Sequence, residues 1–262
     1  MFPAICRAEE APAVEQEVQQ FSFTGYTKDG KKEWEVRGDS AVLEGEVATF
    51  QKPKLESTGE TSFTVTSERG SYNRQTAQAH LEENVLAETN DGATLKTESL
   101  DWHGDSKKIS TEDKVVIEKE AILSQGKGAE AYPDLNKFVL KEDVKVEMAP
   151  DVQITSKGPM ELDYAKHIAV FQGEVKIIDR EGEVLADRMD VHFDPETNQV
   201  YEVIAAGNVQ IKRGDSISYS EKAIYDARLR KVTLTGKPKL YIRSEEEENV
   251  MADDPFLKSM KR

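Results

Sequence analysis

The side chains best suited to metal binding or covalent chemistry are few and scattered in this chain of 262 residues. Its four histidines are His80, His103, His167 and His192, and none of them forms the HExxH spacing that brings two imidazoles to one zinc ion. The single cysteine, Cys6, excludes an intrachain disulfide and any zinc or iron–sulfur site that needs several thiolates. We therefore expect no metal site and no cofactor, and we interpret the histidines as exposed strand or turn residues.

The motifs of nucleophile, phosphate and dinucleotide sites (GxSxG, GxxxxGK[ST] and GxGxxG) do not occur in the sequence. The GKG at residues 126–128 is too short for a phosphate loop and is interpreted as a turn. The DPETN at residues 194–198 begins like a calcium loop but lacks the later Gly and Glu, so it predicts a turn before a strand. Acidic residues are spread evenly and no catalytic pair stands apart from them. We predict that the protein is not an enzyme.

Charge and hydropathy narrow the classes of partner. The chain has 35 basic and 50 acidic residues and a net charge of −15, which disfavours binding to nucleic acid because phosphate attraction needs a positive field. No apolar stretch approaches the ~18–20 residues of a membrane-spanning helix. Residues 1–20 are interpreted as a disordered leader or the stub of an anchor, with Cys6 either an ordinary thiol or a lipidated cysteine. Residues 244–262 are interpreted as an acidic, disordered tail.

Aromatic residues recur through the chain with a period near 30. Each is followed by a polar turn segment and then by an apolar alternation that contains a valine at an equivalent position. A period of this length over most of the chain indicates an internal array of similar units. The aromatic residues are Tyr72, Trp102, Tyr132, Tyr164, Phe193 and Tyr225. The equivalent valines are Val85, Val115, Val144, Val175 and Val209.

Within each unit the apolar residues alternate with polar ones. Val203, Ala205, Val209 and Ile211 are an example, and the positions between them are mostly polar. Period two is the pattern of a strand with one apolar face. Each unit is therefore predicted to be two strands and two turns, which gives an all-β, antiparallel fold of about fourteen to sixteen strands. Strands with one apolar face need a facing layer, so we expect two sheets packed together.

Polar residues or glycines interrupt most of the second strands on their apolar face, at Glu83, Asp113, Glu142, Gly207 and Gly236. A carboxylate is costly inside a closed apolar core but is tolerated where a strand bends around a corner or reaches an open edge. We therefore predict a sandwich that gapes along one side. A slip in phase between the apolar residues at 168–170 and those at 175–177 predicts a β-bulge near residue 173.

Several stretches resemble the OstA-like modules of the lipopolysaccharide-transport proteins LptA and LptC. The pattern is an apolar strand, a Gly/Glu-Asn-Val step, a second strand and a segment that ends in Tyr-Asp or Tyr-Asn. It occurs at residues 69–88 (RGSYN…LEENVLAE), 162–177 (LDYAKHIAVFQGEVKI) and 191–211 (VHFDPETNQVYEVIAAGNVQI). Residues 23–56 and 97–118 (TESLDWHGDSKKISTEDKVVIE) are similar to the front of an LptC-like domain.

This resemblance covers residues 20–243. It implies a β-jellyroll, or open "β-taco", with an LptC-like part at 21–150 and an OstA/LptA-like continuation at 151–243. The array is longer than one such module, and the N-terminal membrane helix expected of LptC is missing. The resemblance implies a non-catalytic periplasmic conduit for lipopolysaccharide, attached to the inner membrane by an anchor outside this sequence. The implied partners are lipid A acyl chains, other Lpt-type modules and an inner-membrane ABC transporter.

An apolar groove between two sheets could shelter acyl chains while sugars and phosphates stay in water. Burial of one CH₂ is worth ~0.8 kcal/mol, so a chain of about twelve carbons gains on the order of 10 kcal/mol. Since the net charge does not attract phosphates, we expect the affinity to come from acyl burial. The candidate lipid-binding residues are Leu81, Val85, Ile109, Val115, Ile117, Phe138, Leu140, Val144, Val146, Leu162, Ile168, Val170, Val175, Ile177, Val191, Val203, Val209, Ile211, Val232, Leu234 and Leu240.

An open array also has a first and a last strand with unpaired backbone groups. Phe21, Phe23, Val232, Leu234 and Ile242 are candidates for assembly by strand addition, including head-to-tail self-association. Two other functions remain open at this point. A structural scaffold would have a closed, dry core and no lipid, and an enzyme on a β-helix, such as a carbohydrate lyase, would have a catalytic cluster on one face.

Overall fold

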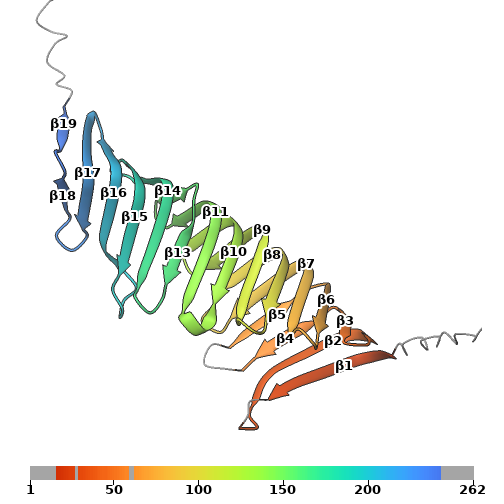
Figure 1. Ribbon diagram of the computed structural model, residues 1–262. Coiled ribbons are helices and arrows are strands. Elements are labelled where there is room, and N and C mark those ends of the chain that lie inside the picture. Colours follow the sequence, from red (N-terminus) through yellow and green to blue (C-terminus); the bar gives the residue numbers. More distant parts are fainter. Residues whose placement is uncertain (1–15, 27–28, 59–61, 243–262) are drawn as a thin grey trace, which may run out of the picture.

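The computed structural model describes residues 16–26, 29–58 and 62–242, and they form an elongated, twisted array of antiparallel strands (Figure 1). The disordered leader predicted for residues 1–20 is wrong at residues 16–20, which belong to a strand. Its remainder, with Cys6, and the predicted acidic tail lie outside the described residues. One short 3₁₀ helix, Pro133–Leu135, accompanies the strands. The strands are β1 Gln16–Tyr26, β2 Lys32–Glu44, β3 Val47–Gln51, β4 Lys54–Ser57, β5 Phe63–Thr66, β6 Arg69–Asn73, β7 Gln78–Thr89, β8 Thr94–His103, β9 Lys108–Lys119, β10 Ile122–Tyr132, β11 Lys137–Met148, β12 Val152–Ser156, β13 Met160–Asp163, β14 Ile168–Ile178, β15 Glu183–Phe193, β16 Val200–Arg213, β17 Ser216–Asp226, β18 Lys231–Thr235 and β19 Lys239–Tyr241.

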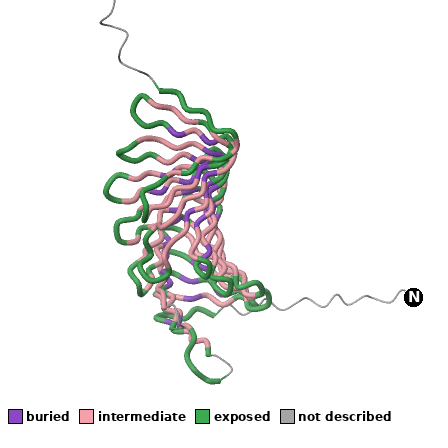
Figure 2. Tube along the Cα trace, turned by 90° about the vertical axis from the view of Figure 1, so that its left-hand side faces the viewer, coloured by how far each residue is buried: buried purple, intermediate pink, exposed green. Residues whose placement is uncertain are grey.

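The strands form two facing layers that meet along one side, and each long strand runs through both (Figures 1 and 2). The short strands show the division, because β11 pairs with β13 in one layer and with β12 in the other. We call the layer that contains β3, β6, β13 and β18 layer A, and the layer that contains β4, β5, β12 and β19 layer B. The side where they meet is the corner, and the opposite, turn-bearing side is the mouth. Successive turns alternate between the layer A and layer B margins of the mouth. The predicted all-β, antiparallel architecture is confirmed, but the described residues form nineteen strands of one continuous sheet folded into two layers, where fourteen to sixteen strands in two sheets were expected.

The corner coincides with β-bulges. The pairing register shifts just before Val85 in β7, Val175 in β14 and Val209 in β16. Gly173 and Gly207 both have φ +78°, a left-handed conformation that glycine adopts without strain. The bulge predicted near residue 173 is therefore confirmed. The polar interruptions lie where the strand passes from one layer to the other, as predicted for a corner.

The valine that recurs in each unit lies at this corner and is at most 1% exposed. Each of these valines faces a small residue of the next strand, and the alternation lets branched side chains fill a narrow angle without crowding. The facing pairs are Val85–Thr97, Val115–Gly126, Val144–Ser156, Val175–Ala186 and Val209–Ser220. One period of about 30 residues therefore corresponds to two long strands, each of which crosses the corner once.

Cross-strand pairing aligns the inner residues into one row in each layer, and both rows run the length of the array. The layer A row is Leu43, Ala48, Tyr72, Ala79, Trp102, Ile109, Ala131, Phe138, Leu162, Ala169, Val191, Val203, Tyr225 and Val232. The layer B row is Phe23, Val36, Leu55, Val65, Ala87, Leu95, Ile117, Ser124, Val146, Ile154, Ile177, Val184, Ile211, Ser218 and Leu240. Neither row is interrupted where β11 passes to β12.

The interior contains two apolar clusters of unequal size. The small one, at the N-terminal end, is built on Phe21, Ala41, Ala48 and Phe50. The large one extends from Val115 through the C-terminal half of the array. Between them the interior is partly polar. Thr97 and Thr111 are buried there, with their hydroxyl oxygens 3.4 Å apart.

Charged residues recur on the outer face of layer B in two adjacent cross-strand rows, one with acidic and one with basic members. Glu35 and Glu56 are direct cross-strand neighbours, whereas Leu123 lies between Glu118 and Glu147. Five acidic residues of this face form ion pairs with basic residues of the adjacent row. The ion pairs are Glu35–Arg37, Glu56–Lys54, Glu118–Lys96, Glu147–Lys145 and Glu183–Lys176.

The two short segments weighed as sites are structural. In the DPETN segment, the Asp194 carboxylate accepts hydrogen bonds from the backbone N–H groups of Glu196 and Thr197, which confirms a turn. The interpretation of GKG as a turn is wrong, because these residues lie inside β10. Gly128 has φ +69° at the corner, and Gly126 lies so close to Leu140 that a larger side chain would crowd it. Gly126 therefore allows close packing against Leu140, and Gly128 allows the left-handed backbone of a bulge.

Candidate functional site: the apolar interior and its mouth

Exposure of the inner residues increases from the corner to the mouth. Val115 at the corner is fully buried, and Leu140 beside it is too. Phe138 and Leu162, nearer the layer A margin, are only half-buried, and Ile122 at the layer B margin is 42% exposed. The interior is therefore an apolar wedge, closed at the corner and increasingly accessible toward the mouth.

The predicted interior residues, apart from Ile168 and Val170, lie in the inner rows, beside them or at the corner. Most belong to the large apolar cluster or pack against it. Leu240 has the inner orientation of the layer B row but is 60% exposed, because it lies on the last strand. Whether any of these residues contacts a lipid remains a prediction.

Ile168 and Val170 are placed wrongly by the sequence interpretation. They lie on the outer face of layer A, where they pair with Asp163 and Glu161. Their neighbours Ala169 and Phe171 face the interior and are buried. The cause is the bulge before residue 175, which reverses the phase of β14, so the preference for branched residues selected the wrong face.

Three buried inner residues that the list of candidate lipid-binding residues left out are Met160, Phe171 and Met189. They face one another across three strands and are at most 6% exposed. Met160 and Met189 alternate with Leu162 and Val191 in the strands that lead to the layer A turns. That alternation was a usable signal.

Side chains from opposite margins meet across the mouth in the C-terminal half. Arg230, in a layer A turn, donates a hydrogen bond of 3.1 Å to Glu181, in a layer B turn. Tyr164, in another layer A turn, is 55% exposed. Burial nevertheless raises the pKa of its phenol, and the charges of Lys119 and Asp91 at the layer B margin act on it. At Arg230 and Glu181, polar side chains therefore bridge the mouth.

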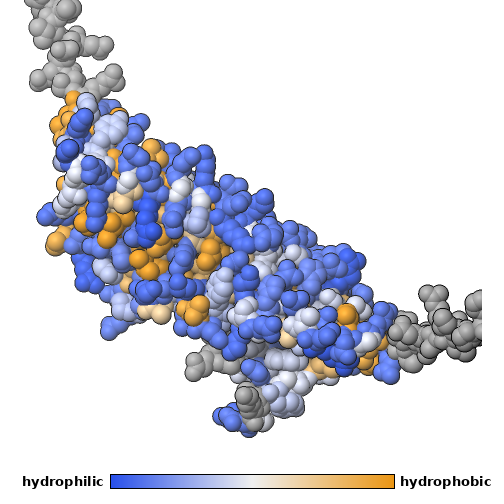
Figure 3. Space-filling model, viewed as in Figure 1, coloured by the Kyte–Doolittle hydropathy of each residue, from blue (hydrophilic) through white to orange (hydrophobic). Residues whose placement is uncertain are grey.

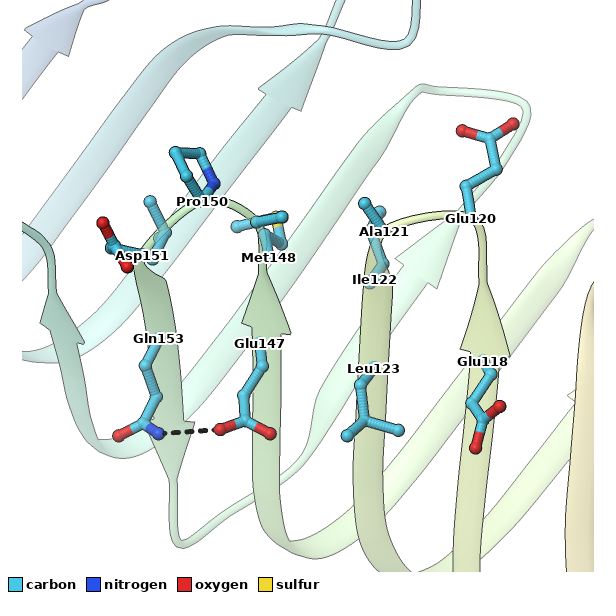
Figure 4. Close-up of a pocket in the computed structure, with 12 residues that line it drawn as sticks. Glu118, Glu120, Ala121, Ile122, Leu123, Glu147, Met148, Pro150, Asp151 and Gln153 are labelled. Carbon is cyan, nitrogen blue, oxygen red and sulfur yellow. Dashed lines mark hydrogen bonds between the residues drawn. The ribbon is translucent and has the colours of Figure 1, made fainter.

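A hollow of about 610 Å³ lies at the ends of the β9–β10 and β11–β12 hairpins (Figure 4). Glu118, Leu123, Glu147 and Gln153 form one cross-strand row along it, and Gln153 donates a 3.3 Å hydrogen bond to Glu147. This row belongs to the outer face of layer B. The hollow is open and mixes apolar and acidic groups.

The histidines occupy ordinary positions. His80 pairs with Asp101 at 2.7 Å and His103 with Ser110 at 3.1 Å, in each case from neighbouring strands of layer A. His192 lies in β15 and His167 in a turn. Within the described residues, no group of three or more His, Cys, Asp or Glu side chains is arranged to hold a metal ion. In the same part of the chain, no helix has the length and hydrophobicity to cross a bilayer.

The two ends of the array are edges, as predicted. Among the described strands, β1 pairs with β2 alone, and β18 and β19 pair with β17 alone. Phe21 at the first edge is buried and Phe23 half-buried. At the last edge Val232 and Leu234 are half-buried, whereas Ile242 is 70% exposed.

Comparison with known proteins adds two family matches. Residues 8–149, more than half of the chain, match the family described as lipopolysaccharide-assembly, LptC-related. Residues 153–254 match the family described as LptA/(LptD N-terminal domain) LPS transport protein. A comparison with curated sequences finds no match. Among solved structures, the chain is similar to LptH of Pseudomonas aeruginosa, the LptA-homologous periplasmic component of its lipopolysaccharide transport device. Identity is 14%, over 47% of this chain and 95% of that chain, with a TM-score of 0.40.

Proposed function

Because this chain belongs to the LptC-related family of lipopolysaccharide-assembly proteins, we propose that it is a non-catalytic conduit for lipopolysaccharide in the periplasm. Lipid A acyl chains would enter the apolar wedge through the mouth, and the sugars and phosphates would remain outside. The two family matches confirm the resemblance to LptC and LptA that the sequence motifs indicated. The acyl-chain site is the new claim.

The observation that carries this proposal is the pair of continuous inner rows. They run from the LptC-like part into the LptA-like part, and β11 and β12 pair directly across the junction from Val144–Ser156 to Met148–Val152. A lipid that moved along the mouth would meet mostly apolar side chains in that passage. One chain would thus supply two consecutive lengths of the transport path.

Energetics favour a transfer role. Burial of an acyl chain in the wedge gains on the order of 10 kcal/mol for about twelve carbons, which is similar to what the chain loses on leaving a bilayer. Transfer is then nearly level in free energy, so its direction must come from another protein. An inner-membrane ABC transporter would supply it, and other Lpt-type modules would extend the path at the exposed C-terminal edge. An anchor outside this sequence would hold the chain at the inner membrane.

A structural scaffold is the second candidate, because the corner of the wedge is already filled by the protein's own valines. It would bind no lipid. The two functions are distinguished by titration of the full chain with intact lipopolysaccharide and with the same molecule after removal of its acyl chains. The conduit predicts binding of the intact molecule and at least about a hundredfold weaker binding of the deacylated one. Equal affinities would contradict acyl burial, and binding of neither would favour the scaffold.

A further inference from the structure

Four arginines lie in or next to turns that border the C-terminal part of the mouth. Arg180 and Arg213 lie at the layer B margin, and Arg228 and Arg230 at the layer A margin. Arg180 pairs with Asp151 on a neighbouring layer B turn. Arg228 pairs with Asp194 at 2.9 Å and lies over the ring of Tyr201. The other two arginines converge on one group.

That group is the carboxylate of Glu181. Arg230 approaches its Oε1 atom at 3.1 Å from layer A, and Arg213 approaches its Oε2 atom at 3.4 Å from layer B. The Glu181 turn is well defined, because the Asp179 carboxylate accepts hydrogen bonds from the backbone N–H groups of Glu181 and Gly182 at 2.8 and 2.9 Å. Two guanidinium groups from opposite margins thus hold one anionic group between them.

Arg213 and Arg230 lie next to the ends of the two inner rows. Ile177, Val184 and Ile211 belong to the layer B inner row. Arg213 lies two residues after Ile211, and the Glu181 turn lies between Ile177 and Val184. Arg230 precedes Val232 of the layer A inner row. An amphiphile with chains between these rows would place its polar head at the arginine pair.

We propose that Arg213 and Arg230 form an anion site for the phosphomonoester head group of an amphiphile, with Glu181 as the counter-ion that occupies it in the free protein. The proposal rests on the conduit function and adds a local source of head-group recognition to acyl burial. Guanidinium groups bind phosphate oxygens through paired, charge-assisted hydrogen bonds.

Displacement of Glu181 requires little free energy. The side chains of Glu181, Arg213 and Arg230 are 51%, 50% and 77% exposed, and ion pairs this open to water contribute little to stability. A phosphomonoester has up to two negative charges and three acceptor oxygens, whereas Glu181 has one charge and two oxygens. The negative net charge of the whole chain opposes long-range attraction, so the site acts at contact distance.

The experiment compares two lipids on four variants of the full chain. The probes are lipid A and lipid A treated with phosphatase, titrated in detergent at fixed ionic strength. Arg213→Gln and Arg230→Gln are expected to weaken binding of phosphorylated lipid A by about tenfold each and binding of the dephosphorylated lipid less than about twofold. Glu181→Gln is expected to tighten binding of phosphorylated lipid A by up to about fivefold. Arg188→Gln is the matched control, since Arg188 pairs with Asp190 on the outer face.

Equal losses for the two lipids, or an equal loss in Arg188→Gln, would overturn the proposal. Inorganic phosphate titrated alone separates the two sources of the anion. Weak binding that disappears in Arg230→Gln supports a head-group site, whereas binding as tight as that of lipid A would assign the site to free phosphate and overturn the head-group claim. If neither lipid bound wild-type protein, the conduit function would fail, and the phosphate titration would still report on the arginine pair.

Discussion

The two ends of the array differ in how they finish their apolar faces. At the N-terminal end the rings of Phe21 and Phe50 stack at a centroid distance of 5.1 Å and are almost fully buried. At the C-terminal end Leu240, Tyr241 and Ile242 are 57–70% exposed, although Tyr241 contacts Tyr219 edge-on. The first edge is closed by its own side chains, and the last edge leaves apolar surface uncovered.

The surface between the ends shows a related difference. Hydrophobic side chains appear between polar ones over β13 to β16, whereas the same face over β7 to β9 is mostly hydrophilic (Figure 3). The C-terminal half also has the larger apolar cluster and the contacts across the mouth. The difference teaches that similar repeats can end in a filled aromatic cap at one terminus and in exposed apolar side chains at the other.

The largest expected effect separates buried from uncovered leucine. Leu140→Ala should lower the free energy of unfolding by about 2–5 kcal/mol, because it opens a cavity in a filled core. Leu240→Ala should change it by no more than about 0.5 kcal/mol, because that side chain is mostly in water. Urea denaturation followed by circular dichroism measures both. Similar losses would mean that the C-terminal edge is as well packed as the core.

The second prediction concerns assembly at the last edge. Ile242→Glu should weaken head-to-tail association, or association with another Lpt-type module, by about tenfold or more, since a charge would be buried against an apolar strand. Leu229→Glu is the control, because Leu229 is equally exposed but lies in a turn. Analytical ultracentrifugation gives the association constants. An equal effect of the two substitutions would show that association does not depend on the C-terminal edge.

The third prediction concerns the aromatic cap. A double-mutant cycle with Phe21→Leu and Phe50→Leu should give a coupling of about 0.5–1.5 kcal/mol, the typical value for a stacked pair beyond its buried area. Chemical denaturation of the four proteins measures it. Additive losses would show that the rings pack independently and that the cap is not a cooperative unit.

The smallest effect is a pH dependence at the same end. Hydrogen bonds from Arg37, Lys32 and Ser22 hold the pKa of Glu35 at about 2, below its usual 4.5. The lowered pKa means that the Glu35 contribution is present above pH 4.5 and is lost as the pH falls toward 2. The stability difference between wild type and Glu35→Gln should therefore shrink over that interval.

Thermal unfolding between pH 2 and 7 tests this dependence. Glu33→Gln removes the same charge from an exposed neighbour and is the control. A difference between wild type and Glu35→Gln that stayed constant with pH would show that the ionised carboxylate does not stabilise the folded state.

The sequence predicted those features that local patterns determine. Period-two alternation predicted the strands, and the recurrent interruptions predicted the corner and its buried valines, such as Val85 and Val209. Two predictions failed at bulges. Val170 was assigned to the inner face because the bulge in β14 reverses the phase of the alternation, and Gly128 was assigned to a turn although it lies at a bulge inside β10. The contact between Glu181 and Arg230, 49 residues apart, could not be predicted, because it depends on how the two layers close in space.

The central claim is that acyl chains occupy the inner rows, and native mass spectrometry of protein purified from a lipopolysaccharide-producing host tests it most directly. Leu162→Gln alters a half-buried inner residue, and Val170→Gln alters a half-buried outer residue on the next strand. The account predicts an adduct of lipid A mass on wild type and on Val170→Gln and its loss from folded Leu162→Gln. No adduct on folded wild-type protein, or one that survives equally in both variants, would contradict it.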